Sequence, residues 1–425
     1  HSDVHGQPKT ELDLFDARVY QKAAYVEYSS PTGSLFYLKH KDVVADSLRL
    51  RLDIRDSING NVISTVEYQQ GRDFEFNAAA GRIILNRPLF GSNSGTTLIV
   101  GNQSGHNGDP IYLVADYSYM VLDDWNKGVT GGTVRSSLTD HISIGAVVVN
   151  EDQKEAIYQL KGVDATIHLD DQNKHALDVE YAQSQSRAAP KHVSTDGGFT
   201  WGISENQIST ADSDTKGQAV AVQGKSSFRD DKVQVDYYYR NVDEDFSAEA
   251  TQYQQGREAV GASVNIKVDE DLNVTVKHDS QKRKAAGDSQ ENNRVGAKSS
   301  HVTRIRADQQ VNDDLQVSVE LRHQDVNEPD TNNQAEANAD MDAIAVQVRY
   351  QAAVNTELTL KQQVTLKGED NTHTTVDIHH GVSERLSVNA GGSHGKQVAT
   401  AHAGVDYAAS EKVSLNSGVK YDTDN

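Results

Sequence analysis

The stretch Arg229-Asp-Asp-Lys-Val-Gln-Val-Asp-Tyr-Tyr-Tyr-Arg240 carries the pattern that decides the fold. After a polar turn at 229–231, every second residue from Val233 to Tyr239 is apolar or aromatic. A period of two places one such set on one face of a β-strand. The same alternation recurs further along, at 260–268, 317–321, 344–350 and 413–421. Helical periodicity is nearly absent, so the sequence predicts an all-β protein.

The connections between these runs alternate between short and long. Short polar turns lie near residues 139–141, 170–173, 229–231, 269–271, 312–314, 354–356, 383–384 and 410–411. Longer polar stretches lie between them, at about 150–157, 183–217, 241–256, 280–293, 325–340, 367–372 and 392–396. In an up-and-down sheet every second connection falls at the same end. The order therefore predicts tight turns at one end of the sheet and long loops at the other.

The length of the runs indicates a membrane barrel. Each has about 8–12 residues, close to the roughly 9–11 that a tilted strand needs to cross a bilayer. Lipid offers no partner to free backbone groups, so a spanning sheet has to close on itself. We predict an antiparallel up-and-down transmembrane β-barrel of about 16 or more strands over residues 126–425. The alternative is a string of soluble β-sandwiches or another extracellular β-array, which would need bulky inward residues where this chain has Gln, Asp, Lys, Arg, Asn and Ser.

Composition narrows the function classes. The 425 residues are 36% hydrophobic with a mean hydropathy of -0.64, which fits a wide barrel with a wet interior. No segment has the roughly 18 consecutive apolar residues of a membrane helix. The net charge of -21 argues against nucleic acid as a partner. Because there is no Cys, disulfide scaffolds, thiolate metal sites and Cys nucleophiles are excluded.

Residues 1–125 have a different character. Leu48, Leu50, Leu52 and Ile54 alternate with polar residues, and strand-like hairpins follow at 48–68 and 71–89. Another strand is predicted at 111–119. We expect a compact N-terminal β-domain with its own apolar core, which caps, plugs or flanks the barrel.

Part of the chain resembles a known group of proteins. Residues 24–28 with 33–40, 51–56, 71–76 and 81–89 resemble a segment just upstream of the C-terminal barrel in large, little-characterised surface proteins of Gram-negative bacteria. Residues 158–164, 181–184 and 196–201 are similar to the start of the barrel in those proteins. The hairpin at 73–89 also resembles repeated hairpins in the giant translocon barrel of type 9 secretion. The resemblance spans about residues 20–205 and implies an outer-membrane location and a large exported region, without supplying catalytic or ligand residues.

The two ends suggest that the chain is part of something longer. It begins at His1 without the basic and apolar regions of a signal peptide, so we expect a mature or trimmed N-terminus. The strand-like run at 413–421 ends only just before Asn425. We therefore expect the natural protein to continue.

Metal and catalytic motifs are weak. The densest histidine group contains His379 and His380, which would face opposite sides of a strand and could not share a site. Acidic pairs such as 170–171 and 230–231 could hold Ca²⁺, but solvated turns explain them better. There is no HExxH, nucleophile elbow, P-loop or dinucleotide fingerprint. We predict no catalytic, cofactor-binding or metal-binding residues, and no enzyme.

One aromatic loop is a candidate contact site. Asp196-Gly-Gly-Phe-Thr-Trp201 places Phe199 and Trp201 after turn-forming glycines in a long loop. The two rings could bind a partner or a sugar, or they could pack the loop against the mouth of the barrel.

Function is predicted only at the level of class. The leading hypothesis is an outer-membrane channel, a translocon-like pore, or the membrane anchor of a large surface assembly. Its expected partners are membrane lipid, lipopolysaccharide, and a protein partner or exported region of the same protein. The alternatives are a secreted or surface structural or adhesive β-protein, and a passive diffusion porin constricted by residues 183–217. If the lumen shares the net charge of -21, the pore should prefer cations.

Overall fold

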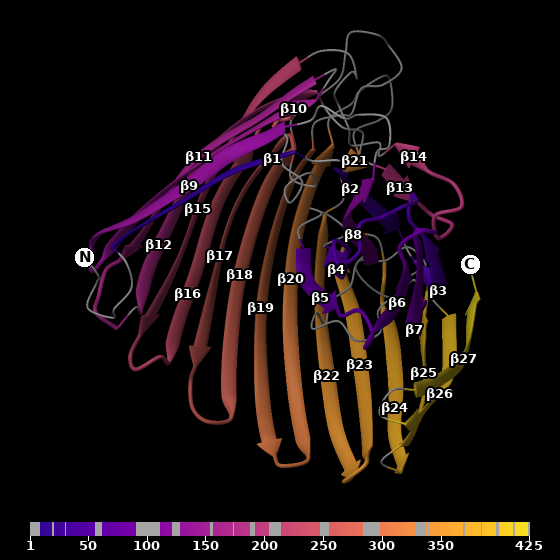
Figure 1. Ribbon diagram of the computed structural model, residues 1–425. Helices are drawn as coiled ribbons and strands as arrows, with labels where there is room; N and C mark the ends of the chain where they lie inside the picture. The colour runs from indigo at the N-terminus through magenta and orange to yellow at the C-terminus, as the bar shows by residue number, and fades with distance from the viewer. Residues whose placement is uncertain are drawn as a thin grey trace.

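The structure is a computed structural model, and it is all β (Figure 1). It describes residues 9–18, 21–29, 31–55, 62–90, 111–120, 128–153, 156–172, 174–187, 192–203, 214–246, 255–283, 298–328, 337–338, 340–368, 370–383, 385–396, 399–410 and 413–423. Within these residues there is no helix of the length and hydropathy that crossing a bilayer requires.

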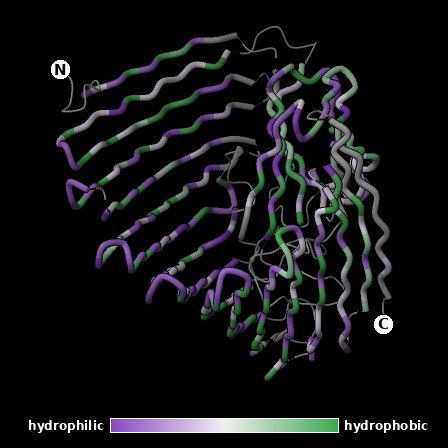
Figure 2. The backbone as a smooth tube through the Cα atoms, turned by 90° about the horizontal axis from the view of Figure 1, so that it is seen from below, coloured by the Kyte–Doolittle hydropathy of each residue, from purple (hydrophilic) through white to green (hydrophobic). Residues whose placement is uncertain are grey.

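Most strands form one long antiparallel sheet that curves into a barrel wall (Figures 1 and 2). Hydrogen-bonded registers join neighbours from β1 through β9 and onward to β27. The strands of the wall are β1 (Thr10–Arg18), β9 (Gly128–Thr139), β10 (Ile142–Gln153), β11 (Ala156–His168), β12 (His175–Arg187), β15 (Asp214–Phe228), β16 (Val233–Val242), β17 (Arg257–Lys267), β18 (Leu272–Arg283), β19 (Lys298–Asn312), β20 (Leu315–Glu328), β21 (Ala337–Asn338), β22 (Met341–Ala353), β23 (Thr356–Lys367), β24 (His373–Ser383), β25 (Leu386–Gly395), β26 (Ala399–Ser410) and β27 (Val413–Thr423). The predicted antiparallel up-and-down barrel of about 16 or more strands is confirmed.

The short turns fall where the sequence predicted them. Tight connections join β9 to β10, β11 to β12, β15 to β16 and each later pair up to β26 and β27. In the turn at 229–231 all three residues have a positive φ, a conformation in which Asp is more at ease than most side chains. Two expected long connections are wrong, because the strand ladder continues through them. At 150–157 the registers of β10 and β11 extend to Gln153↔Ala156, and at 392–396 the residues up to Gly395 pair within β25.

The wall has an apolar outer face and a polar inner face. On β19 the inward Arg304 is 6% exposed, whereas the next residue, Ile305, is 44% exposed and points outward. On β20 the inward Glu320 is buried and its neighbour Leu321 is exposed. In a water-soluble protein this arrangement would be inverted, so the outer face suits lipid.

The remaining strands form a small domain of two packed sheets. One sheet contains β2 (Gln21–Ser29), β8 (Ile111–Met120), β4 (Arg49–Arg55) and β5 (Val62–Tyr68), and the other contains β3 (Thr32–Tyr37), β7 (Arg82–Phe90) and β6 (Phe74–Asn77). Tyr28, Phe36, Leu50, Ile83 and Leu113 are among the residues of the core between them. These strands match the ones that the alternation at 48–54 and the hairpins predicted.

Two segments belong to a different unit from the strands that surround them in the sequence. β1 lies within residues 1–125, yet it pairs with β9 and belongs to the barrel wall, which corrects the expected extent of the small domain. The physical reason is its alternation: Leu12 and Leu14 are 61% and 76% exposed and point outward with the apolar face of the wall. Conversely, β13 (His192–Ser194) and β14 (Gly202–Ile203) come from the long connection after β12 and add to the sheet of the small domain.

Candidate functional site in the barrel lumen

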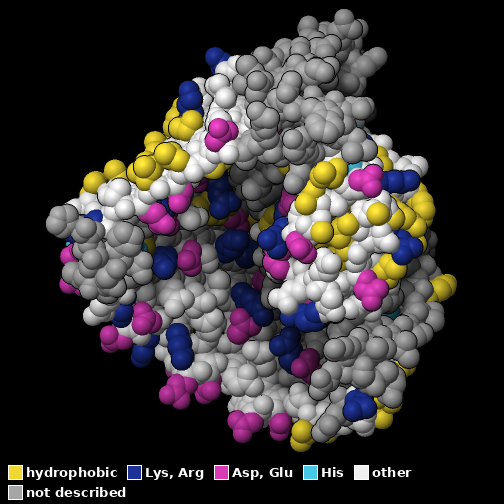
Figure 3. All heavy atoms as spheres, viewed as in Figure 1, with side chains coloured by type: hydrophobic (Ala, Val, Ile, Leu, Met, Phe, Trp, Pro, Cys, Tyr) yellow, Lys and Arg dark blue, Asp and Glu magenta, His cyan; other side chains and the backbone are white. Residues whose placement is uncertain are grey.

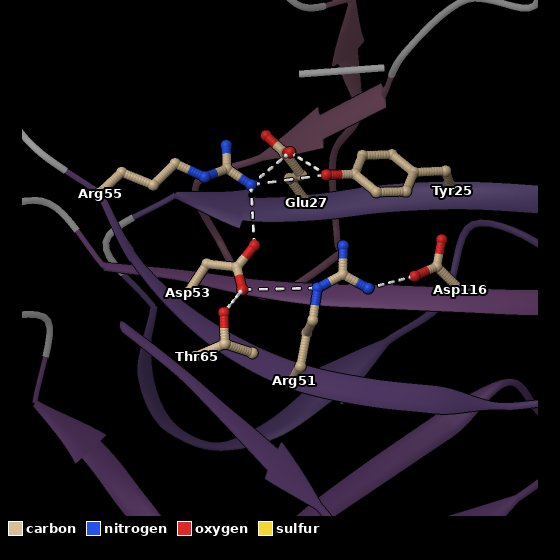
Figure 4. Close-up of polar contacts among 7 residues, drawn as sticks. All are labelled: Tyr25, Glu27, Arg51, Asp53, Arg55, Thr65 and Asp116. Atoms are coloured by element: carbon tan, nitrogen blue, oxygen red, sulfur yellow. Dashed lines mark hydrogen bonds and ion pairs between the residues drawn. The ribbon is translucent and has the colours of Figure 1, made fainter. Parts of the chain in front are cut away.

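One face of the small domain carries a buried network of charges (Figure 4). Because side chains alternate along β2, β4 and β8, the face opposite to the apolar core holds Tyr25, Glu27, Arg51, Asp53, Arg55 and Asp116. Arg55 donates through Nη2 to Glu27 Oε1 at 2.8 Å and to Asp53 Oδ2 at 3.2 Å. Glu27 and Asp53 are each only 2% exposed. Buried charges of this kind persist only when they are paired.

The environment shifts the titration of the network. Burial, the largest single influence, lowers the pKa of Arg55, but Glu27, Tyr25 and Asp53 together outweigh it, so that the pKa lies above its ordinary value. Burial raises the pKa of Asp116, and Arg51 compensates only partly. Asp53 also accepts a hydrogen bond from Thr65 Oγ1 at 2.9 Å. The network is therefore a set of interacting ion pairs that are largely shielded from solvent.

This charged face points toward the wall of the barrel. The guanidinium of Arg257, at the start of β17, lies within electrostatic range of Arg55, Glu27 and Tyr112. The Arg55 guanidinium also stacks over the ring of Tyr112, 4.3 Å from its centroid. At its other side the small domain touches the end of the wall, where β7 contacts β27. Figures 1 and 2 show the domain on the concave side of the sheet.

The inner face of the wall is covered in one part and open in another. On β20 and β23 the inward side chains of Glu320, Arg322 and Gln363 are 1%, 2% and 0% exposed. On β9 the inward side chain of Arg135 is 61% exposed, although it pairs with Asp164 at 3.0 Å. Figure 3 shows a hollow between the wall and the small domain, with acidic and basic side chains along it. The inner face of the wall is thus covered along β20 and β23 and exposed at Arg135 of β9.

A cavity of about 400 Å³ lies on the open part of the inner wall. Its polar lining comes from the inward faces of β12, β15, β16, β17 and β18. These residues are Asp178, Gln223, Lys225, Asp236, Tyr238, Arg240, Ser263 and Lys277, and Gly224, Tyr237 and Ala262 complete the lining. Sequence alternation had placed Asp236 and Tyr238 on the face opposite to Val235, but it gave no sign of which inward residues would meet.

The predicted contact residues Phe199 and Trp201 lie against the small domain. Trp201 packs at the edge of its core, with its ring 5.4 Å from that of Tyr28. Phe199 is 69% exposed and lies 5.3 Å from the ring of Tyr37. Gly197 and Gly198 have positive φ, and the Gly197 carbonyl accepts a hydrogen bond from Tyr37 N at 2.8 Å. Binding of a partner through these rings stays a prediction.

The loop strand β13 should respond to pH. His192 pairs in register with Val26 of β2, and its Nε2 contacts Lys39 Nζ. Burial and the nearby Lys39 lower the pKa of His192. A base whose pKa is lower in the folded state than in the unfolded state stabilises the fold at pH values above the unfolded pKa, which is about 6.5 for histidine. This stabilisation is lost as the pH falls through the folded pKa.

We therefore expect β13 to loosen from β2 on acidification. Trp201 reports on this when Trp125, the only other tryptophan, is replaced by Phe. Quenching of Trp201 fluorescence by acrylamide should increase between about pH 7 and pH 5, because a second positive charge then faces Lys39. The variant His192→Gln should remove most of this increase. An equal increase in both proteins would show that another group is responsible.

The described residues contain no cluster of three or more His, Asp or Glu side chains positioned for a metal ion. His379 and His380 occupy opposite faces of β24, in register with Asn389 and Val388 of β25.

Comparison with solved structures finds chains that are similar to this one at low sequence identity. The FrpB iron transporter from Neisseria meningitidis is similar over 93% of this chain and 81% of its own, with 10% identity and a TM-score of 0.40. The siderophore receptor PirA from Pseudomonas aeruginosa covers 88% and 76%, at 11% identity and a TM-score of 0.39. Outer-membrane expressed OmpT of Vibrio cholerae covers 97% and 100%, at 10% identity and a TM-score of 0.30. No family model and no curated protein sequence matches.

The class of the protein follows from its own strands and lumen. An antiparallel up-and-down wall with an apolar outer face, short turns at one end and a polar interior is the architecture of outer-membrane β-barrels. The outer face needs lipid, and strands span a membrane only as a barrel. The chain is therefore an outer-membrane β-barrel protein that also carries a small β-domain.

Proposed function

We propose that the protein is a passage for small hydrophilic solutes, in which the small domain narrows the lumen without filling it. The observation that carries this proposal is the contrast along the inner wall. Inward side chains are buried on β20 and β23 and exposed on β9, beside the hollow. A lumen lined by charged groups of both signs stays hydrated, which a passage for polar solutes requires. No catalytic role is part of this proposal.

The passage can be tested by cysteine accessibility, since the natural chain contains no Cys. Gln223 and Gln363 form a matched pair on the inner wall: the first is exposed in the cavity, and the second is 0% exposed. We expect Gln223→Cys to react with a charged, membrane-impermeant methanethiosulfonate reagent and to lower the conductance in planar bilayers. Gln363→Cys should react at least about tenfold more slowly, because reaction requires access. Absence of conductance, or equal reactivity of both cysteines, would contradict the proposal.

A second role is compatible with the same barrel. The resemblance over residues 20–205 favours a membrane base for a larger exported region, with lipid and lipopolysaccharide around it. Translocation of a polypeptide, as in a translocon, would require the small domain to leave the lumen. The segment 183–217, the predicted constriction of a diffusion porin, contains β13 and β14, which add to the sheet of the small domain. Constriction of the pore by this segment stays a prediction. The cation preference expected from the net charge stays a prediction.

A further inference from the structure

The cavity on the inner wall contains two opposite charges that face each other across neighbouring strands. Lys225 of β15 and Asp236 of β16 are partners in the register of these strands, and both line the cavity. Side chains placed in this way have Cβ atoms about 4.5–5.5 Å apart. Both residues are exposed, and within the described part of the chain neither side chain has an ion-pair or hydrogen-bond partner. The cavity therefore presents one cation and one anion that are not engaged with each other.

Two other cations that line the cavity already have partners. The Lys277 ammonium group lies 3.3 Å from the Asp279 carboxylate. The Arg240 guanidinium lies over the ring of Tyr238, 5.6 Å from the ring centroid. A solute that bound these cations would compete with contacts that the protein makes itself. The two opposed side chains on β15 and β16 are instead charges that a solute can bind without displacing a protein partner.

This arrangement favours a solute that carries both charges. A simple anion would meet Lys225 but would also approach the carboxylates of Asp236 and Asp178. A simple cation would meet these carboxylates but would also approach Lys225. A neutral solute would displace water from charged groups without compensating their charge, which is costly. A solute with an ammonium group and a carboxylate group compensates both sides of the cavity.

We propose that this cavity binds zwitterionic solutes, namely α-amino acids and short peptides. The carboxylate of the solute would accept hydrogen bonds from Lys225, and its ammonium group would donate to Asp236. Asp178 accepts a hydrogen bond from Thr166 Oγ1 at 2.8 Å through Oδ1, and its second oxygen can accept from the same ammonium group. A volume of about 400 Å³ is in the range of small-molecule sites. The inference rests on the proposed function and names the class of solute that the passage binds.

The test uses the full chain at neutral pH in a detergent with an uncharged headgroup, and the dipeptide alanyl-alanine as the probe. Two blocked forms carry one charge each: N-acetyl-alanyl-alanine is an anion, and alanyl-alanine amide is a cation. Binding can be titrated by saturation-transfer difference NMR. The affinity for the free dipeptide should be about three- to fivefold higher than for either blocked form, as expected for a charge pair that stays partly hydrated.

Two substitutions assign each charge of the dipeptide to a side chain. Lys225→Gln should lower the affinity for alanyl-alanine by about three- to fivefold without lowering that for the amide. Asp236→Asn should lower the affinity for alanyl-alanine without lowering that for the acetylated form. Arg135→Gln and Asp164→Asn are the matched controls, because these inner-wall charges pair with each other at 3.0 Å and are not part of the cavity lining. Both controls should bind the dipeptide as the unmodified protein does.

The possible results separate this inference from the proposed passage. Failure of alanyl-alanine to bind, equal affinity for the free and blocked dipeptides, or equal effects of Lys225→Gln and Arg135→Gln would overturn the inference. Conductance in planar bilayers without dipeptide binding would refute this inference alone. Dipeptide binding without conductance would refute the proposed passage alone.

Discussion

Substitution of Arg55 by alanine is expected to destabilise the small domain by about 3–5 kcal/mol, the usual cost of removing one partner from a buried ion pair. Arg55 holds Glu27 at 2.8 Å and Asp53 at 3.2 Å, and both carboxylates are almost fully buried. Without the guanidinium these two negative charges would lie close together with little solvent. The loss is expected to exceed that of most single substitutions, which average near 1 kcal/mol.

Hydrogen–deuterium exchange with mass spectrometry can measure this effect in the intact protein. Peptides from β2, β4 and β8 should exchange about 10²- to 5×10³-fold faster in Arg55→Ala, because the free energy of local opening falls by about 3–5 kcal/mol. Arg72→Ala is the matched control, because Arg72 pairs with Asp73 on the surface at 2.8 Å. Exposed pairs contribute about 0–1 kcal/mol, so exchange in this variant should hardly change.

A second substitution distinguishes the loss of the Arg55–Glu27 ion pair from the cost of leaving the Glu27 carboxylate buried without that partner. In the Arg55→Ala background, Glu27→Gln should recover part of the lost protection, because it removes one buried charge that has lost its partner. If protection in Arg55→Ala stayed at the level of the unmodified protein, the network would be hydrated rather than buried.

The strands of the wall could be predicted from the sequence because the pattern that specifies them involves only residues close together in the chain. A period of two tells which residues share a face, and the turn residues tell where each strand ends. Thus the turn at 229–231 and the opposite faces of Val235 and Asp236 were both predictable. The same rule assigns β1 to the wall once the outward Leu12 and Leu14 are noticed.

The lumen could not be predicted in the same way, because its contacts join residues far apart in the chain. Arg257 meets the charged face of the small domain, and β13 pairs with β2, across more than a hundred residues. Alternation shows that Glu320 and Asp236 both face inward. Only the position of the small domain decides that Glu320 is buried and Asp236 is exposed.

Substitution of Val222 by arginine should prevent or strongly impair stable insertion, whereas the same substitution at the next residue should be tolerated. Val222 lies on the outward face of β15 near the middle of the strand, and Gln223 lies on the inward face beside the cavity. Arginine on the lipid face costs about 2–4 kcal/mol at the bilayer midplane, and substitutions in the lumen cost much less. Inward arginines already occur in the wall, at Arg304 and Arg322.

The two variants differ only in the face that receives the charge, so their comparison tests the orientation of the whole wall. Folding into liposomes can be followed by the shift in gel mobility on heating and by urea titration. Val222→Arg should lower the urea midpoint or the folded yield, and Gln223→Arg should stay close to the unmodified protein. Because registers tie each strand to its neighbours, one inverted strand would invert them all. An equal loss in both variants, or a larger loss for Gln223→Arg, would mean that the apolar face of this sheet does not meet lipid.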